Sequence, residues 1–360
     1  MCIRDRDKAV KIREGQSLNS DSLETYLRNN MQLPDTNIEV LQFPSGYSNL
    51  TYLLKFGEKE LVLRRPPKGV NIKSGHDMHR EFRILSGLHP IYSKVPKPYL
   101  FCDDERILGA PFYVMERLRG IIYRGHTPEK LLPDPNQMKS LSEAFVNTLL
   151  EIHSLNYNDA GFDKLGRPDG YVKRQIEGWT KRYINAKTDE FESLEKVYTW
   201  LNNNIPTEQR VAFIHNDFKY DNLILSQDQS LEVKGVLDWE MATLGDPLMD
   251  LGTTLGYWIQ ESDPDFLKEN NMNITLVKGN LTRSQIVEKY SKISNIEMKN
   301  ISFYYVYGLF KIAVIIQQIY YRYKNGYTAD IRFKNLNEAV EMYGKMGLQA
   351  LQKNKIDNLY

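Results

Sequence analysis

Short runs of apolar and β-branched residues fill the first third of the chain. Glycine-containing turns separate three of these runs, a pattern typical of strands. We predict strands at Ile38–Phe43, Thr51–Phe56 and Leu61–Arg65, and a further strand pair that ends at Phe112–Arg117.

Helical spacing surrounds these strands and dominates after Gly120. A first helix is predicted at Ser20–Asn30, and a second near His76–Leu88, whose apolar residues recur at helical spacing. Further helices are predicted at Asn136–Leu155, Tyr171–Lys187, Phe191–Asn203, Thr282–Ser294, Ser302–Tyr323 and Asn335–Lys353. Only residues 213–237 return to short strands.

This order of elements predicts an α+β protein with a small β-rich amino lobe and a large helical carboxyl lobe. We place an extension with the first helix at 1–34, the amino lobe at 35–118 and the carboxyl lobe at 119–360. The first half-dozen residues have no apolar core, which argues against a secretory signal, and we expect them to lie outside the native domain.

One apolar segment, Ile301–Tyr321, is about as long as a bilayer is thick. Lys311 lies in its middle, and a charge at mid-span is costly in lipid. We therefore predict a buried helix of the carboxyl lobe and no membrane span.

Composition narrows the class of partner. The chain has 360 residues and a formal net charge of +1, so no overall field favours nucleic acid or an anionic membrane. Two cysteines, Cys2 and Cys102, cannot build a disulfide framework, and their scarcity favours a cytoplasmic location.

The strongest chemical signal runs from His215 to Asn222 and has the form H-x-D-x-x-x-x-N. Asp238 follows sixteen residues after Asn222, behind an apolar run. In phosphoryl transfer such an aspartate accepts the proton of the acceptor hydroxyl, while the asparagine and the second aspartate hold Mg²⁺ against the phosphates. Taken singly, Asp217 and Asn222 are also ordinary loop and turn residues, but their combination with Asp238 favours catalysis.

These motifs resemble the aminoglycoside phosphotransferase and choline kinase superfamily. The resemblance is greatest to the subgroup that also occurs as the amino-terminal domain of some acyl-CoA dehydrogenases. It covers residues 35 to 260 well, and it rests on Phe43–Asn49, Leu61–Arg64, His79–Phe82, Pro111–Arg117, Gly166–Tyr171, His215–Asn222 and Asp238–Asp250. It implies a protein-kinase-like two-lobed fold and an ATP- and Mg²⁺-dependent transfer to a small-molecule hydroxyl.

The resemblance also implies a nucleotide site in the amino lobe. The loop that covers the ATP phosphates would contain Ser45, Gly46, Ser48 and Asn49. Val62 would contact adenine, and Arg64 would contact phosphate and pair with Glu81. Met115, Glu116 and Leu118 would form the hinge that binds adenine through backbone atoms.

Arg64 departs from the common family pattern, which has lysine at this position. Arginine keeps the charge, but its reach and geometry differ. The remaining implied roles fall in the carboxyl lobe. Lys219 would steady the transferring phosphoryl group, although a solvated lysine is an equal alternative. Asp250 would accept backbone N–H groups from the catalytic loop.

Several functions remain after these assignments. A protein kinase is disfavoured because Gly245–Asp250 begins too soon after Asp238 to leave room for an activation segment. Residues 261–360 contain 14 Lys and Arg against 10 Asp and Glu, a difference of +4, which favours a hydroxy acid or hydroxyacyl-CoA acceptor. The alternatives are a catalytically inactive nucleotide-binding module, which Arg64 favours, and an aminoglycoside- or choline-type kinase.

Overall fold

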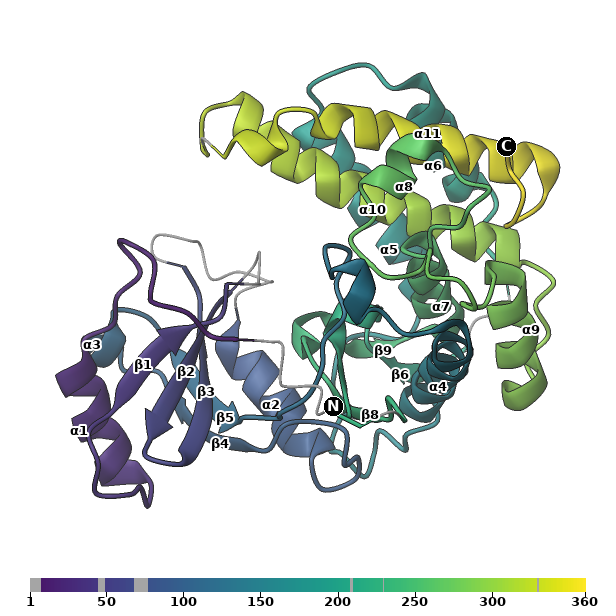
Figure 1. Cartoon of the computed structure of the whole chain (residues 1–360). Coiled ribbons are helices and arrows are strands. Elements are labelled where there is room, and N and C mark those ends of the chain that lie inside the picture. Colours follow the sequence, from purple (N-terminus) through teal and green to yellow (C-terminus); the bar gives the residue numbers. More distant parts are fainter. Residues whose placement is uncertain (1–7, 45–48, 68–76, 208–209, 229, 329) are drawn as a thin grey trace. The chain divides into compact units, whose positions relative to one another are not determined.

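The computed structural model describes residues 8–44, 49–67, 77–207, 210–228, 230–328 and 330–360 (Figure 1). Contacts between residues group the chain into two compact units. Unit 1 contains the described residues up to Ile122, together with Asn158–Gly161 and Asn222–Ala242, and unit 2 contains the rest. The predicted lobe boundaries at 34/35 and 118/119 stay predictions.

Unit 1 is built on a five-stranded antiparallel sheet with the strand order β1-β2-β3-β5-β4. One face of the sheet forms an apolar core with α1 and α3, through residues such as Leu23, Leu27, Leu61 and Leu63. The strands are β1 (Glu39–Gln42), β2 (Leu50–Phe56), β3 (Lys59–Arg65), β4 (Pro98–Cys102) and β5 (Phe112–Glu116), and the helices are α1 (Ser20–Asn30), α2 (Met78–Leu88) and α3 (Glu105–Leu108).

Successive side chains of β3 point to opposite faces of the sheet, so the two faces have different surroundings. Leu61 and Leu63 belong to the apolar core, which leaves Val62 and Arg64 on the opposite side. Helix α2 packs against β4, β5 and η3 (Trp239–Met241). A late hairpin of β7 (Leu223–Leu225) and β8 (Val233–Val236) also belongs to unit 1.

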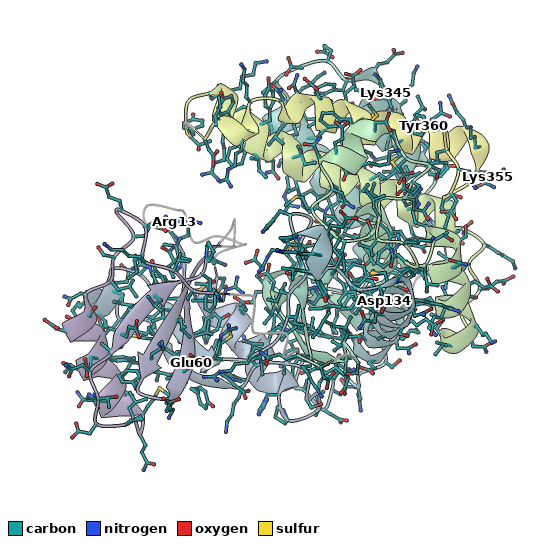
Figure 2. All side chains as sticks on the ribbon, viewed as in Figure 1. Arg13, Glu60, Asp134, Lys345, Lys355 and Tyr360 are labelled. Carbon is teal, nitrogen blue, oxygen red and sulfur yellow. The ribbon has the colours of Figure 1, made fainter. Side chains whose placement is uncertain are left out.

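Unit 2 is helical and is organised around α10, which contacts α5, α6, α7 and α11 (Figure 1). Charged side chains such as those of Asp134, Lys345 and Lys355 lie on its exterior (Figure 2). The helices are α4 (Pro135–His153), α5 (Tyr171–Ala186), α6 (Glu192–Asn203), α7 (Pro247–Gly256), α8 (Asp265–Glu269), α9 (Arg283–Ser294), α10 (Ile301–Lys324) and α11 (Leu336–Lys353). A short antiparallel pair, β6 (Ala212–Ile214) and β9 (Thr243–Gly245), completes the unit.

Most predicted elements are present with ends shifted by one or two residues, and α1 matches its predicted bounds. Helix α7 was not predicted from the sequence. All ten residues of this helix are buried, so no alternation of polar and apolar faces marks it in the sequence. A proline at its first turn and a capping aspartate, Asp246, were the available signals.

Helix α10 is the one described helix long and apolar enough to cross a membrane. Of its most apolar 18-residue window, 72% is buried inside the protein. This burial is what the prediction of a core helix requires.

Candidate active site

Arg64 is the centre of a charged cluster in unit 1. Its guanidinium donates to Glu81 at 2.5 Å and to Asp238 at 3.0 Å, and it lies 3.6 Å from Glu240. The predicted pair with Glu81 is therefore present. Burial by itself lowers the pKa of Arg64, but Glu81 and the other acidic neighbours raise it well above its usual range.

Glu81 reaches this cluster from the first turn of α2 and is 1% exposed. Burial raises its pKa, and the nearby Arg64 opposes that rise. Such a buried pair costs desolvation energy for both ions and persists only with good geometry. Through Arg64 the cluster links the end of β3 to α2 and to Asp238.

Two residues without an assigned role in the sequence analysis complete this cluster. Glu240 accepts a hydrogen bond from Asn49 at 2.8 Å, which links the residue directly before β2 to η3. Arg80 donates to the backbone carbonyls of Glu240 and Ala242. Three carboxylates against two guanidiniums leave an excess of negative charge, which suits a bound cation.

The predicted metal ligands lie at one end of the β7–β8 hairpin. Leu223 pairs with Val236, and the backbone N–H of Leu237 donates to the carbonyl of Asn222 at 2.9 Å. Asn222 and Asp238 flank these paired residues, so the hairpin brings them to the same end. Asp238 has the left-handed φ of 68°, which turns the chain directly after the strand.

These two residues fit a magnesium ion that also binds phosphate. Mg²⁺ usually takes one or two protein oxygens and completes its shell with water and phosphate oxygens. Asn222 supplies an amide oxygen, and Asp238 has a carboxylate that is 31% exposed. The described residues contain no cluster of three His, Cys, Asp or Glu side chains that would hold a metal by themselves.

The predicted adenine contacts lie side by side on the sheet. Val62 on β3 is the register partner of Met115 on β5, and each is 6% exposed. The backbone N–H of Glu116 donates to Lys97, while Leu118 follows β5 in the connector. Asn49 is described, but Ser45, Gly46 and Ser48 lie outside the described residues. Adenine binding by this group stays a prediction.

The predicted catalytic loop, His215–Asn222, belongs to unit 2 up to Asp221, and Asp250 of α7 binds its first residues. Asp250 accepts the backbone N–H groups of His215 at 2.7 Å and Asn216 at 2.8 Å, as the resemblance implied. His153 contacts the same carboxylate at 3.1 Å. Burial alone would raise the pKa of Asp250, but these partners hold it below its usual value.

Asp217 is 15% exposed in its side chain, and both of its carboxylate oxygens have a polar neighbour within unit 2. Tyr257 donates its hydroxyl to one carboxylate oxygen at 2.9 Å, and the ammonium of Lys219 lies 3.1 Å from the other. Lys219 also lies 5.0 Å from the centre of the Tyr257 ring. The structure thus brings Lys219 to Asp217 as an ion pair, and it adds Tyr257, which no sequence motif indicated.

Asp217 and Asn222 are joined by a short, continuous span. Five residues of extended chain reach at most about 18 Å, so the span sets an upper limit on the separation of Asp217 and Asn222. The span is packed by aromatic rings: Phe218 and Tyr220 lie 4.5 and 4.7 Å from Phe145, measured between ring centres.

The sequence of residues 39–271 matches the model of a protein family described as "Phosphotransferase enzyme family". The chain belongs to this phosphotransferase family.

Relatives and solved structures agree with that assignment. Acyl-CoA dehydrogenase family member 10 of Mus musculus is 34% identical over 88% of this chain, and family member 11 of Homo sapiens is 32% identical over 93%. The chain spans only 29% and 43% of the lengths of these two relatives. The predicted resemblance to the superfamily and to this subgroup is confirmed.

The fold agrees as well. A Ralstonia eutropha protein provisionally named an aminoglycoside phosphotransferase superposes with a TM-score of 0.78 at 26% identity, covering 94% of this chain and 99% of the other. Choline kinase from Cryptosporidium parvum superposes with a TM-score of 0.65 at 12% identity, covering 95% and 98%. The predicted kinase-like fold is confirmed.

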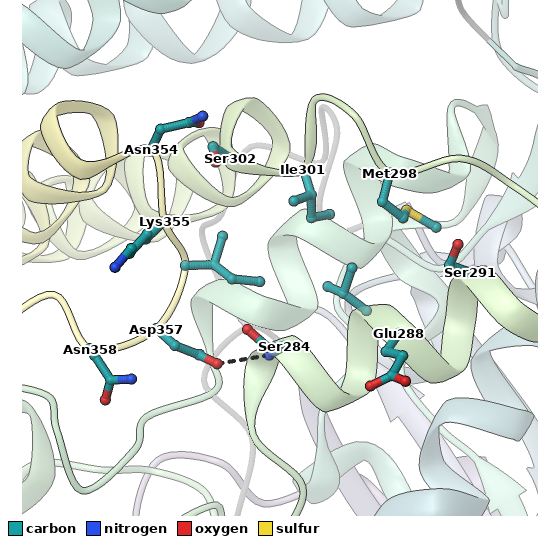
Figure 3. Close-up of a pocket in the computed structure, with 12 residues that line it drawn as sticks. Ser284, Glu288, Ser291, Met298, Ile301, Ser302, Asn354, Lys355, Asp357 and Asn358 are labelled. Atoms are coloured by element: carbon teal, nitrogen blue, oxygen red, sulfur yellow. Dashed lines mark hydrogen bonds between the residues drawn. The ribbon is translucent and has the colours of Figure 1, made fainter.

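A separate pocket of this phosphotransferase lies in unit 2 and contains none of the predicted site residues (Figure 3). It has a volume of about 600 Å³ and is lined by α9, the start of α10 and residues 354–358 of the tail. Asp357 anchors the tail there by accepting the backbone N–H of Ser284.

Proposed function

We propose that this phosphotransferase transfers the γ-phosphoryl group of ATP, bound with Mg²⁺, to a hydroxyl group of a small molecule. The observation that carries the proposal is the span Asp217–Asn222. This span begins at the Asp217 carboxylate, in a loop whose N–H groups are bound by Asp250. It ends at the β7–β8 hairpin, which brings Asn222 and Asp238 to the same end.

Each residue then has one task. Asp217 orients the acceptor hydroxyl and takes its proton as the oxygen attacks the γ-phosphorus. The bond from phosphorus to the bridging oxygen breaks, and ADP leaves with that electron pair. Asn222 and Asp238 would hold Mg²⁺, which supplies positive charge to the phosphate oxygens. Arg64 and Lys219 add fixed positive charge for the phosphates.

The acceptor we favour is a hydroxy acid or a hydroxyacyl-CoA. The support is the similarity to proteins named acyl-CoA dehydrogenase family members. The basic residues of the carboxyl lobe support this acceptor less than their number in the sequence suggests. Lys311 is buried, while Lys324 and Arg332 form ion pairs with Asp189 and Asp330. These three cations are therefore poor candidates for a wall that attracts anions.

The test is ADP release from MgATP in the presence of pooled hydroxy acids, their CoA thioesters, amino alcohols or aminoglycosides. We expect turnover with the acid or thioester pool, and none in Asp217→Asn, which should still bind MgATP. Asp265→Asn, at an exposed aspartate of unit 2, is the matched control and should retain full activity. Turnover that survives in Asp217→Asn would refute the mechanism.

A second variant separates an active kinase from an inactive nucleotide-binding module. Asp238→Ala should abolish the Mg²⁺-dependent thermal shift that ATP produces in the native protein. An ATP-induced shift in the native protein, with no ADP release from any pool, would favour the inactive module. Turnover with aminoglycosides or amino alcohols alone would replace the proposed acceptor class.

A further inference from the structure

Lys311 is a buried ammonium in the middle of the apolar helix α10. It is 1% exposed, and its Nζ donates to the backbone carbonyl of Asn216 at 2.6 Å. Burying a lysine in an apolar core is costly, since its charge loses hydration. A methionine would fill the same space without that cost, so the lysine calls for another explanation.

The carbonyl that Lys311 holds belongs to the peptide group directly before Asp217. The N–H of the same peptide group, contributed by Asp217, donates to Nδ1 of His215 at 3.2 Å. Both ends of this peptide plane are therefore held. Together with the two N–H groups bound by Asp250, four hydrogen bonds hold three consecutive residues of the loop.

The held peptide follows an unusual backbone conformation. Asn216 has the left-handed φ of 69°, which a residue other than glycine adopts at some cost. Its side chain is held as well, because Tyr171 donates to its Oδ1 at 3.1 Å. The turn therefore depends on its surroundings, and Lys311 is the one charged donor among these contacts.

The crossing of α7 and α10 places both charged groups under the loop. Gly252 and Gly308 let the two helices meet backbone to backbone: a Cβ on Gly308 would lie 2.0 Å from the carbonyl oxygen of Gly252. Asp250 comes two residues before Gly252 on α7, and Lys311 three residues after Gly308 on α10. The close approach brings an acceptor for the loop N–H groups and a donor for its carbonyl to one place.

The charges around Lys311 are mixed. Burial lowers its pKa to about 8, against the attraction of Asp217 and Asp250 and with help from Arg182 and Lys219. The Trp179 ring of α5 lies 5.8 Å from the ammonium. The ammonium thus interacts electrostatically with two carboxylates, one of which is the proposed base.

We propose that Lys311 is a positioning residue for phosphoryl transfer: by holding the Asn216 carbonyl, it sets the direction in which Asp217 presents its carboxylate to the acceptor hydroxyl. The inference rests on the proposed function for its catalytic consequence, but the effect on the loop does not depend on it. Lys311 touches neither substrate nor phosphate in this account. It acts through the peptide plane.

The variant that tests this is Lys311→Met, and Gln317→Leu is the matched control. Gln317 is also buried on α10, but it donates to Ala186 and Thr188, outside the catalytic loop. Hydrogen–deuterium exchange on the full chain reads the loop directly. We expect the amides of His215 to Asp217 to exchange roughly tenfold faster in Lys311→Met, as for the loss of one hydrogen bond, and at the native rate in Gln317→Leu.

Steady-state kinetics measure the effect of the Lys311 substitutions on catalysis. With the acceptor pool that supports turnover, Lys311→Met should lower kcat roughly 10- to 100-fold while KM for ATP stays within about twofold, because misorientation affects the transition state and not nucleotide binding. Lys311→Arg, which keeps a charged donor, should recover part of kcat. Loss of kcat to the same extent in Gln317→Leu would reduce Lys311 to a packing role.

The two proposals fail differently. Native loop exchange in a folded Lys311→Met overturns the positioning role, whatever the enzyme does. Faster loop exchange in Lys311→Met, combined with no phosphoryl transfer by the native protein, would support the role of Lys311 in the loop and refute the proposed function. Circular dichroism checks the fold of each variant. If Lys311→Met does not fold, Lys311→Gln, which is neutral and too short to reach, supplies the same readings.

Discussion

Replacing Arg64 by methionine would leave Glu81 in the core of unit 1 without its counter-ion. Glu81 is 1% exposed, and its carboxylate forms an ion pair with the Arg64 guanidinium at an N–O distance of 2.5 Å. Two unit charges about 4 Å apart interact by about 4 kcal/mol at the effective dielectric constant of a protein site. Removing one partner of a buried pair typically costs about 3–5 kcal/mol, so we expect Arg64→Met to lose about 4 kcal/mol of unfolding free energy at pH 8.

The loss should depend on pH in a defined direction. Burial already raises the pKa of Glu81 in the native protein, and removing Arg64 takes away the main group that opposes the rise. In the variant, the folded state then binds a proton more tightly than the unfolded state does. Stability is therefore greatest below the unfolded pKa of about 4.5 and falls as pH rises towards the folded pKa. Arg64→Met should be less destabilised at pH 5 than at pH 8.

Urea unfolding followed by circular dichroism at both pH values measures this. Glu81→Gln added to Arg64→Met should recover most of the loss, because it removes the uncompensated charge. Arg119→Met, which breaks an exposed pair with Glu60, is the control and should cost less than about 1 kcal/mol. A loss below about 1 kcal/mol at pH 8 in Arg64→Met, or one equal at both pH values, would refute the reasoning.

Two further predictions concern α10 and its neighbour α5. Gly308→Ala should destabilise the protein by about 3 kcal/mol in urea unfolding, because its Cβ would collide with the Gly252 carbonyl. Gly178→Ala on α5, where nothing lies within 4 Å of the added Cβ, should stabilise the protein by about 1 kcal/mol. Equal effects of the two substitutions would show that the crossing of α7 and α10 is not tight. Lys311→Met should be more stable than the native protein by about 2–3 kcal/mol at pH 7, since a pKa of about 8 against the usual 10.5 means that the folded state disfavours the charged lysine. That advantage should shrink between pH 8 and 10.5, where the unfolded native chain binds more protons and native stability rises with pH, and a variant less stable at pH 7 would contradict it.

The candidate site of this phosphotransferase could be predicted from sequence because most of its residues lie in contiguous segments. The string from His215 to Asn222 lies on one loop, and the hairpin that follows brings Asn222 and Asp238 to the same end, so residue types and spacing alone predicted them as one site. Arg64 and Glu81 were paired by their positions in a family pattern, and the structure contains that pair. The strand and helix patterns predicted most elements for the same local reason.

Spacing could not predict contacts made across the fold. Asn49 meets Glu240 across 191 positions, and Lys311 meets Asn216 across 95. In the sequence Lys311 argued against a membrane span and counted among the basic residues of the carboxyl lobe, but nothing linked it to the loop. Helix α7, buried on all sides, left no periodic signal, although it carries Asp250.

The sequence by itself determined which residues we propose for phosphoryl transfer, because residue type and local spacing are written along the chain. Only the tertiary structure decided what holds them in place. The reason is physical: the contact between Gly252 and Gly308 sets how closely α7 and α10 approach, and that approach decides which buried charges reach the catalytic loop.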